Sequence, residues 1–174
     1  MADGKKGRIH VEIRQATTAD LPQIMGIFEQ ARRFMRQTGN PTQWGPDYPG
    51  LALMEEQIRQ GVCYVCTRQD RVEGTFCLIF GADPTYAHIS DGAWPDEAPY
   101  ATIHRLASAG RVHGIAGTCI DWCGARAGTL RADTHADNRV MQHLLEKAGF
   151  VRCGVIRVAD GSPRLAYWRG QTTN

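Results

Sequence analysis

Alternating and helical spacings of apolar residues divide the first third of the chain into elements. Apolar and polar side chains alternate over residues 9–14, which predicts a half-buried strand. Over residues 21–35 the apolar side chains return every three or four positions, which predicts an amphipathic helix. Thr17 and Asp20 precede this helix with the spacing of a capping box. A shorter helix is expected over residues 50–60.

The middle of the chain predicts a hairpin, a long loop and a strand that leads into a helix. Apolar and β-branched residues dominate 62–67 and 72–80, and a short polar turn separates them, as in a β-hairpin. Residues 81–99 are rich in Gly, Pro and Asp, so we expect an irregular loop; loops of this length are commonly functional. A strand over 101–107 and a helix over 115–126 follow.

The last third of the chain predicts one more helix among three strands. A strand over 129–133 precedes a helix that Asn138 or Asp137 caps and that carries a single apolar stripe. Two further strands are expected over 151–156 and 164–168. The order of elements is therefore β, α, α, β, β, β, α, β, α, β, β, which indicates an α/β fold.

Length and composition describe one ordinary globular domain. The 174 residues are 43% hydrophobic and 22% charged, which suffices for a full core. We expect residues 1–8 to form a flexible tail and residues 9–174 to form the domain. A net charge of +2 argues against a nucleic-acid partner and against an anionic membrane surface. No apolar run reaches membrane-spanning length and no signal-peptide core opens the chain, which favours a cytoplasmic protein.

Six cysteines raise the question of a disulfide framework or a metal site. Cys63 and Cys66 form a C-x-x-C pair, but three residues apart on a strand they face opposite sides. No second pair with metal-ligand spacing follows, so we expect no metal. Cys119 and Cys123 are four residues apart on a predicted helix, share one face and are expected in the core. Free thiols throughout fit a reducing cytoplasm.

The turn after the strand over 101–107 offers candidate chemistry. Its sequence is Arg111-Val112-His113-Gly114-Ile115-Ala116-Gly117. A strand that enters a glycine-containing turn and then a helix leaves unpaired N–H groups at the helix start, where the helix dipole also favours an anion. Gly114 and Gly117 allow close approach of a ligand, and Arg111 can add a charge. The segment matches neither of the common nucleotide-binding patterns, and many such turns bind nothing.

Two segments of the chain resemble signatures of the GCN5-related N-acetyltransferase (GNAT) family. Residues 111–116 are similar to its acyl-CoA loop, (Gln/Arg)-x-x-Gly-x-(Gly/Ala). Residues 138–150, Asn-Arg-Val-Met-Gln-His-Leu-Leu-Glu-Lys-Ala-Gly-Phe, resemble its second signature, an asparagine opening a helix that ends Glu-Lys-x-Gly-Phe. The order of elements is also similar over nearly the whole chain. The resemblance implies a mixed, mostly antiparallel twisted sheet flanked by helices.

The resemblance also implies an activity, the transfer of an acetyl group from acetyl-CoA to a primary amine that attacks the thioester directly. The pyrophosphate would lie on the N–H groups of residues 112–117, with Arg111 beside them. The pantetheine arm would lie between the strands that end at Leu106 and Asp133, which splay apart in the family. The Leu106 N–H would then stabilise the oxyanion, and Asn138 would contact the arm.

The residues that would move protons are less evident. Many family members have a tyrosine, which protonates the leaving thiolate, at the position of Leu145; here water or another group would serve, or the thiolate would leave unprotonated. His104 is the first candidate for the base, because imidazole titrates near neutral pH. Alternatively, His104 is bonded within the sheet, or water removes the proton. Strand alternation places His104 and Leu106 on one face unless a bulge intervenes. Weaker candidates are His135, Asp133, His143 and Glu73.

Loop aromatics are candidates for acceptor binding, with anchoring of the loops as the alternative. They are Trp44, Tyr48, Tyr86 and Trp94. The expected acceptor is a small-molecule amine or an amino acid. A protein N-terminus or lysine, or a catalytically silent acyl-CoA-binding module, are the alternative readings. We also expect a homodimer, because the strands over 151–156 and 164–168 would leave an exposed apolar edge.

Overall fold

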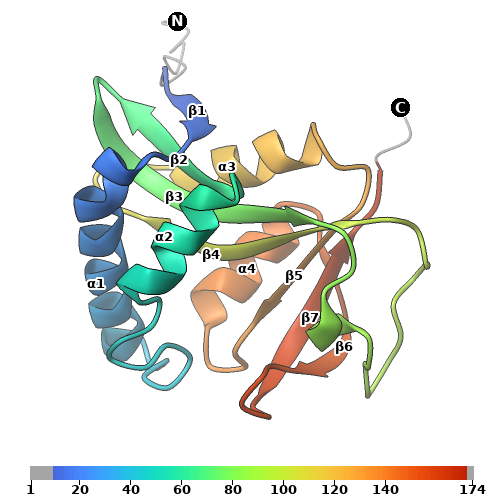
Figure 1. Ribbon diagram of the computed structural model, residues 1–174. Coiled ribbons are helices and arrows are strands. Elements are labelled where there is room, and N and C mark those ends of the chain that lie inside the picture. Colours follow the sequence, from blue (N-terminus) through green and yellow to red (C-terminus); the bar gives the residue numbers. More distant parts are fainter. Residues whose placement is uncertain (1–9, 172–174) are drawn as a thin grey trace, which may run out of the picture.

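Seven strands form one sheet, with helices on both faces, in the computed structural model, which describes residues 10–171 (Figure 1). The strands are β1 (Glu12–Gln15), β2 (Cys63–Arg68), β3 (Arg71–Phe80), β4 (Ala101–Ser108), β5 (Leu130–Thr134), β6 (Val151–Arg157) and β7 (Pro163–Arg169). The helices are α1 (Leu21–Gln37), α2 (Leu51–Arg59), α3 (Ile115–Gly124) and α4 (Arg139–Lys147), with short 3-10 turns η1 (Thr18–Asp20) and η2 (Pro84–Tyr86). The expected tail, residues 1–8, lies outside the described residues.

The strands are ordered β1-β2-β3-β4-β5-β7-β6 across the sheet. Neighbouring strands run antiparallel except β4 and β5, which are parallel. The predicted order of elements and the mixed, mostly antiparallel sheet are therefore confirmed. No helix between residues 10 and 171 combines the length and the apolar character that crossing a membrane requires.

Capping interactions fix where α1 begins. The Thr17 backbone N–H donates to Asp20 Oδ2 at 2.7 Å, which closes the predicted capping box around η1. Arg14 on β1 forms an ion pair with the same carboxylate at 2.8 Å, and its hydrogen bonds are the first cause of the lowered pKa of Asp20. Strand β1 and helix α1 are thereby joined at their connection.

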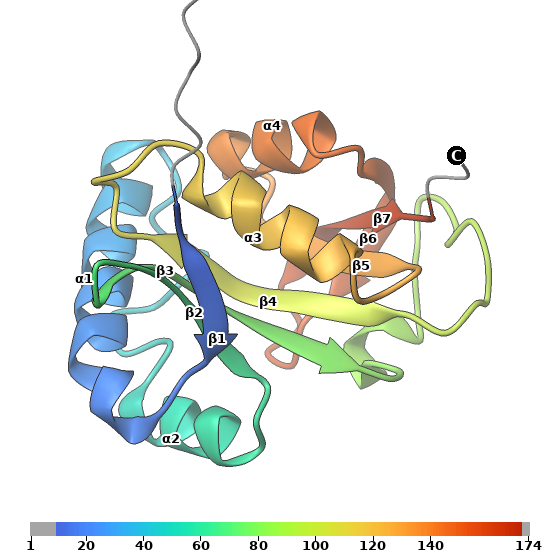
Figure 2. The same cartoon turned by 90° about the horizontal axis from the view of Figure 1, so that it is seen from above.

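Each face of the sheet has its own apolar core. Helices α1 and α2 pack on one face, called here the α1–α2 face, with Cys63, Val65 and Cys77 beneath them. Helix α3 packs on the opposite face, the α3–α4 face, over Cys66 and Phe76, and α4 lies beside it (Figure 2). Cys63 and Cys66 thus lie on opposite faces, as predicted from their spacing. All six cysteines are free, and Cys119 and Cys123 are buried in the core.

The long loop over 81–99 covers the α1–α2 face beyond β5. Tyr86 of η2 is buried there against Ile156 of β6 and Ala166 of β7. Ser90 forms a bridge with Val155 of β6. Because β7 lies between β5 and β6, it is not a sheet edge, and the expectation of an exposed edge on both terminal strands is wrong for β7. Of these two strands, β6 is at an edge of the sheet, with Val151 50% exposed and Ile156 buried.

Candidate active site

Strands β4 and β5 separate shortly after they meet. Their pairing is limited to Ala101 with Leu130 and Thr102 with Arg131, although β4 continues to Ser108 (Figure 1). Beyond these pairs the two parallel strands share no ladder contacts, so backbone donors and acceptors facing the gap are available to a ligand. The sheet is therefore open at the place where the resemblance puts the pantetheine arm.

A bulge in β4 places the side chains of His104 and Leu106 on different faces of the sheet. Cys77 pairs with His104 and Thr75 pairs with Ala107, so two residues of β4 oppose the single Phe76. Arg105, one of those two, has φ of 54°, in the left-handed region. His104 consequently lies on the α1–α2 face, whereas the side chain of Leu106 packs against the α3–α4 core. The bulge that would separate His104 from Leu106, which strand alternation left open, is present.

A small cavity of about 50 Å³ lies where the strands separate. Leu106 of β4 and Asp133 of β5 line it, together with Asn138 at the start of α4 and Trp44 from the loop after α1. This volume holds only a few water molecules. The gap thus brings together Leu106, Asn138 and Trp44, three of the predicted site residues.

The start of α3 presents unpaired backbone donors. The first helical hydrogen bond runs from the Thr118 N–H to the Gly114 carbonyl at 3.0 Å, so the N–H groups of residues 115–117 have no partner within the helix. Gly114 is the N-cap residue and has φ of 82°, a conformation that side chains disfavour. His113 is exposed and Val112 is partly buried. This geometry suits a phosphate group, and the role predicted for residues 112–117 stays a prediction.

Arg111 is engaged within the protein. Its Nε donates to Glu73 Oε2 at 3.2 Å and its Nη2 donates to the Val72 carbonyl at 2.8 Å. The guanidinium therefore connects the loop before α3 to β3. Glu73, one of the weaker base candidates, is the ion-pair partner of Arg111. Contact between Arg111 and a phosphate stays a prediction, and the other donors of the guanidinium would have to make it.

Asn138 caps α4 and contacts the loop after α1. Its side-chain oxygen accepts a hydrogen bond from the Met141 N–H at 3.0 Å, and its side-chain nitrogen donates to Gln43 Oε1 at 2.9 Å. The predicted cap is therefore Asn138 rather than Asp137. Because Asn138 lines the cavity, it is placed to contact a ligand there, and that contact remains a prediction.

His104 forms a pair with a carboxylate that the sequence argument missed. Its Nε2 lies 2.9 Å from Oδ2 of Asp83, at the start of the loop over 81–99. The pKa of Asp83 is lowered to about 2, first by the hydrogen bond with His104. An imidazole held by a carboxylate is a common arrangement for a general base, because the carboxylate stabilises the imidazolium. His104 is thus bonded to a loop and not within the sheet.

Tyr86 and Asp133 form a second pair next to the first. The Tyr86 hydroxyl donates to Asp133 Oδ2 at 2.6 Å, and the Tyr86 and His104 rings lie 6.3 Å apart. Removal from water raises the pKa of Asp133, while Tyr86 and His104 act to lower it. Burial and then the charge of Asp133 raise the pKa of Tyr86 well above its usual value, so Tyr86 stays protonated as a donor. Because Asp133 also lines the cavity, the Tyr86–Asp133 pair borders it.

The aromatic candidates divide between the site and the loop anchors. Trp44 lines the cavity, and the Tyr48 hydroxyl accepts a hydrogen bond from Arg105 at 3.0 Å. Tyr86 contacts Asp133 from a fully buried position. Trp94 instead donates its indole N–H to the Tyr86 carbonyl at 2.9 Å and stacks on Arg131. In this structure Trp94 anchors the loop and does not line the cavity.

The other proton-transfer candidates are placed elsewhere. His135 Nδ1 accepts a hydrogen bond from the Asp137 N–H at 3.0 Å and thus fixes the turn into α4. His143 is exposed on α4. Within residues 10–171 no group of three or more His, Cys, Asp or Glu side chains is arranged to hold a metal.

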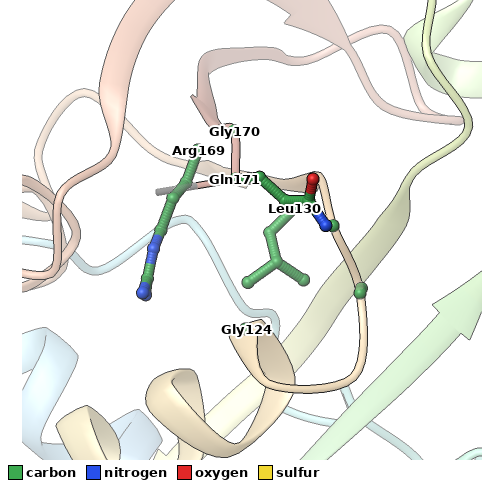
Figure 3. Close-up of a pocket in the computed structure, with 7 residues that line it drawn as sticks. Gly124, Leu130, Arg169, Gly170 and Gln171 are labelled. Carbon is green, nitrogen blue, oxygen red and sulfur yellow. The ribbon is translucent and has the colours of Figure 1, made fainter. Parts of the chain in front are cut away.

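Another hollow lies away from these residues. It has a volume of about 230 Å³ and lies between the end of α3 and the start of β5 (Figure 3). Arg169 extends along it toward Asp121 of α3, 3.7 Å away, and Gly124 and Gly170 form parts of its wall. None of the predicted site residues lines it, so the candidate active site is the gap between β4 and β5.

Solved structures show which proteins the chain is similar to. A GNAT family acetyltransferase from Streptococcus agalactiae is 32% identical, with 94% of this chain and 96% of that chain covered and a TM-score of 0.84. Two further structures share the fold. One is an N-acetyltransferase from Staphylococcus aureus, 22% identical, with 92% of this chain and 98% of that chain covered and a TM-score of 0.58. The other is the NatC complex bound to Gag peptide and CoA, 13% identical, with 93% of this chain and 99% of that chain covered and a TM-score of 0.61. No family model matches the chain, and no curated protein does.

The similarity to the streptococcal enzyme extends over nearly the full length of both chains, and Asn138, which opens the second signature, lines the cavity between β4 and β5. The resemblance seen in the sequence is thereby confirmed: the chain belongs to the GNAT family and is an acyl-CoA-dependent N-acetyltransferase.

Proposed function

We propose that the chain transfers an acetyl group from acetyl-CoA to the primary amine of a small molecule or amino acid. The observation that carries this proposal is the His104–Asp83 pair on the α1–α2 face, next to the cavity between β4 and β5. The similarity to a GNAT family acetyltransferase supports acetyl as the transferred group. We also propose a cytoplasmic location, which the six free cysteines support.

The residues around the gap fit an acyl-CoA, which supplies an activated acyl group when bound. The unpaired N–H groups at the start of α3 would hold the pyrophosphate, with Arg111 and Asn138 as further contacts. The backbone N–H of Leu106, beside the bulge, would donate to the carbonyl oxygen as it gains negative charge. These assignments agree with both sequence signatures.

On the acceptor side, His104 would remove a proton from the acceptor ammonium and Asp83 would stabilise the resulting imidazolium. The free amine then forms the new bond to the acetyl carbon while the bond from that carbon to sulfur breaks. The nitrogen then carries one proton more than the amide needs. Because Leu145 provides no proton for the sulfur, this proton would pass through water to the leaving thiolate. Trp44 and Tyr48 would border the acceptor, with Tyr86 behind them.

The experiment is release of free thiol from acetyl-CoA in the presence of a panel of primary amines, amino acids and peptides. Turnover with small amines or amino acids is the expected result. Binding of acetyl-CoA without turnover of any acceptor would instead indicate a silent acyl-CoA-binding module. Preferential turnover of peptides would favour transfer to a protein N-terminus or lysine.

A further inference from the structure

Arg105 is the residue of the candidate site that local packing explains least. It lies in the β4 bulge with φ of 54°, a backbone conformation that few residues other than glycine adopt. The bulge sends its side chain to the α1–α2 face, the same face as the preceding His104. A strained position between His104 and Leu106 often marks a functional constraint.

The hydrogen-bond partners of the Arg105 guanidinium include no carboxylate. Nη1 donates to the Tyr48 hydroxyl at 3.0 Å and Nη2 donates to Gln57 Oε1 of α2 at 2.8 Å, whereas Nε is buried without a partner. In the described part of the chain no carboxylate lies within 4.0 Å of it. Guanidinium groups shielded from water normally pair with an acid, so this one lacks its usual partner.

A neighbouring thiol is a poor substitute for that acid. The pKa of the Cys77 thiol is lowered, first by a hydrogen bond from Cys63 and also by the charge of Arg105 and a hydrogen bond from it. Sulfur accepts hydrogen bonds weakly, and the Cys77 side chain is completely buried beneath α1 and α2. Nη1 and Nη2 each donate one N–H group to Tyr48 or Gln57, so the second N–H groups of the fork are the ones that a carboxylate would take.

The other charges of this face are already used. Asp83 is paired with His104, and Asp133 accepts the Tyr86 hydroxyl. Arg131 is held between the rings of Trp94 and Tyr100. Arg164 of β7, near Asp133, donates to the carbonyls of Pro163 and Gln43. Arg105 is thus the cation without an acid that directly follows the residue that would activate the amine.

We propose that Arg105 binds a carboxylate of the acceptor, with Tyr48 and Gln57 holding the guanidinium in place. The acceptor class is then amino acids and related amines with a carboxylate near the amine, and not simple amines or polyamines. A planar guanidinium fits the two oxygens of a carboxylate, which lysine does not reproduce. This inference rests on the acetyl transfer proposed above and names the acceptor class of the same site.

A purely structural role predicts a different outcome. If Arg105 served only to join β4 to α2 and to the loop at Tyr48, its loss would change the turnover of all acceptors alike. A substrate-binding role changes the preference between acceptors that differ in the carboxylate. The preference is therefore the quantity to measure.

The test compares each amino acid with its own carboxamide, which keeps the amine and the side chain and loses the negative charge. Thiol release from acetyl-CoA gives kcat/KM for both members of each pair, with the wild type, Arg105→Gln and Arg105→Lys. Arg32→Gln is the matched control, because the Arg32 guanidinium donates to the Tyr48 carbonyl of the same loop at 3.1 Å. Calorimetry with CoA shows whether each variant is folded and binds cofactor.

The wild type should prefer the amino acid by about tenfold or more in kcat/KM, as expected for a charge-assisted pair. Arg105→Gln should abolish the preference by raising KM for the acid alone, Arg105→Lys should restore it in part, and Arg32→Gln should retain it. Equal turnover of acids and carboxamides by the wild type, or a parallel loss for both with Arg105→Gln, would overturn the proposal. An absence of turnover with every acceptor would contradict the transfer reaction itself, which is a separate outcome.

Discussion

At the scale of single residues, His104 and Asp83 form the pair on which the proposed proton transfer depends. His104→Ala and His104→Gln should lower kcat by about a hundredfold or more, because a positioned base typically contributes 10²–10⁴-fold. A general base makes the turnover rate of the wild type rise with pH, and both variants should lose this rise. Calorimetry should show that their CoA binding is unchanged. Rates near those of the wild type with an unchanged pH profile would remove His104 from the mechanism and favour the water route.

The same pair makes the free energy of unfolding depend on pH in the acidic range. The pKa of Asp83 is about 2 in the folded chain, below its ordinary value of 3.8, first because of the hydrogen bond with His104. The carboxylate therefore stabilises the fold fully above about pH 4, and this contribution is lost as the pH falls through 2. Asp83→Asn should flatten the dependence of the urea midpoint on pH across this window. Asp91→Asn, in an exposed part of the same loop, should leave the dependence unchanged.

At the scale of the elements, the turn into α3 depends on one glycine. Gly114 has φ of 82°, where a side chain costs about 1–2 kcal/mol, and its N–H neighbours face the expected pyrophosphate. Gly114→Trp should weaken CoA binding by about tenfold or more through strain and obstruction. Gly161→Trp, in the turn between β6 and β7, is the control for strain alone, since its φ of 83° is similar and a Cβ there meets no atom within 4 Å. Unchanged CoA affinity of a folded Gly114→Trp protein, measured by calorimetry, would show that the loop is assigned wrongly.

Local patterns predicted the elements, and contacts over long sequence separations account for what they missed. The start of α1 at Thr17 and Asp20 and the cap at Asn138 were readable because each signal lies within a few residues. Asp83 was missed because its partner is His104, 21 residues away. The Arg105 bulge was foreseen only as a condition, since strand alternation gives no sign of an inserted residue. Trp94 looked like a pocket residue because a loop position alone does not tell anchoring from binding.

At the scale of the whole molecule, the edge strand β6 is the remaining basis for self-association. Its Val151 is 50% exposed, and Ser90 bridges only to Val155 along the described edge. We predict a homodimer through β6, with light scattering giving twice the chain mass. Val151→Lys should shift the mass toward the monomer, because a charge on an edge strand opposes pairing. A monomer mass for the wild type at all concentrations would exclude this association.

The short pairing of β4 with β5 divides the sheet into a four-stranded part and a three-stranded part. Two residue pairs join β1-β2-β3-β4 to β5-β7-β6, so the two parts have few shared backbone bonds to keep them from opening separately. A ligand whose amides pair with both strands would act as a further strand between them. Amide hydrogen exchange in β5 and β7 should therefore slow when CoA is added, by up to about a hundredfold at a hundred times its dissociation constant. The cofactor would then be a part of the fold's cooperativity as well as a reactant.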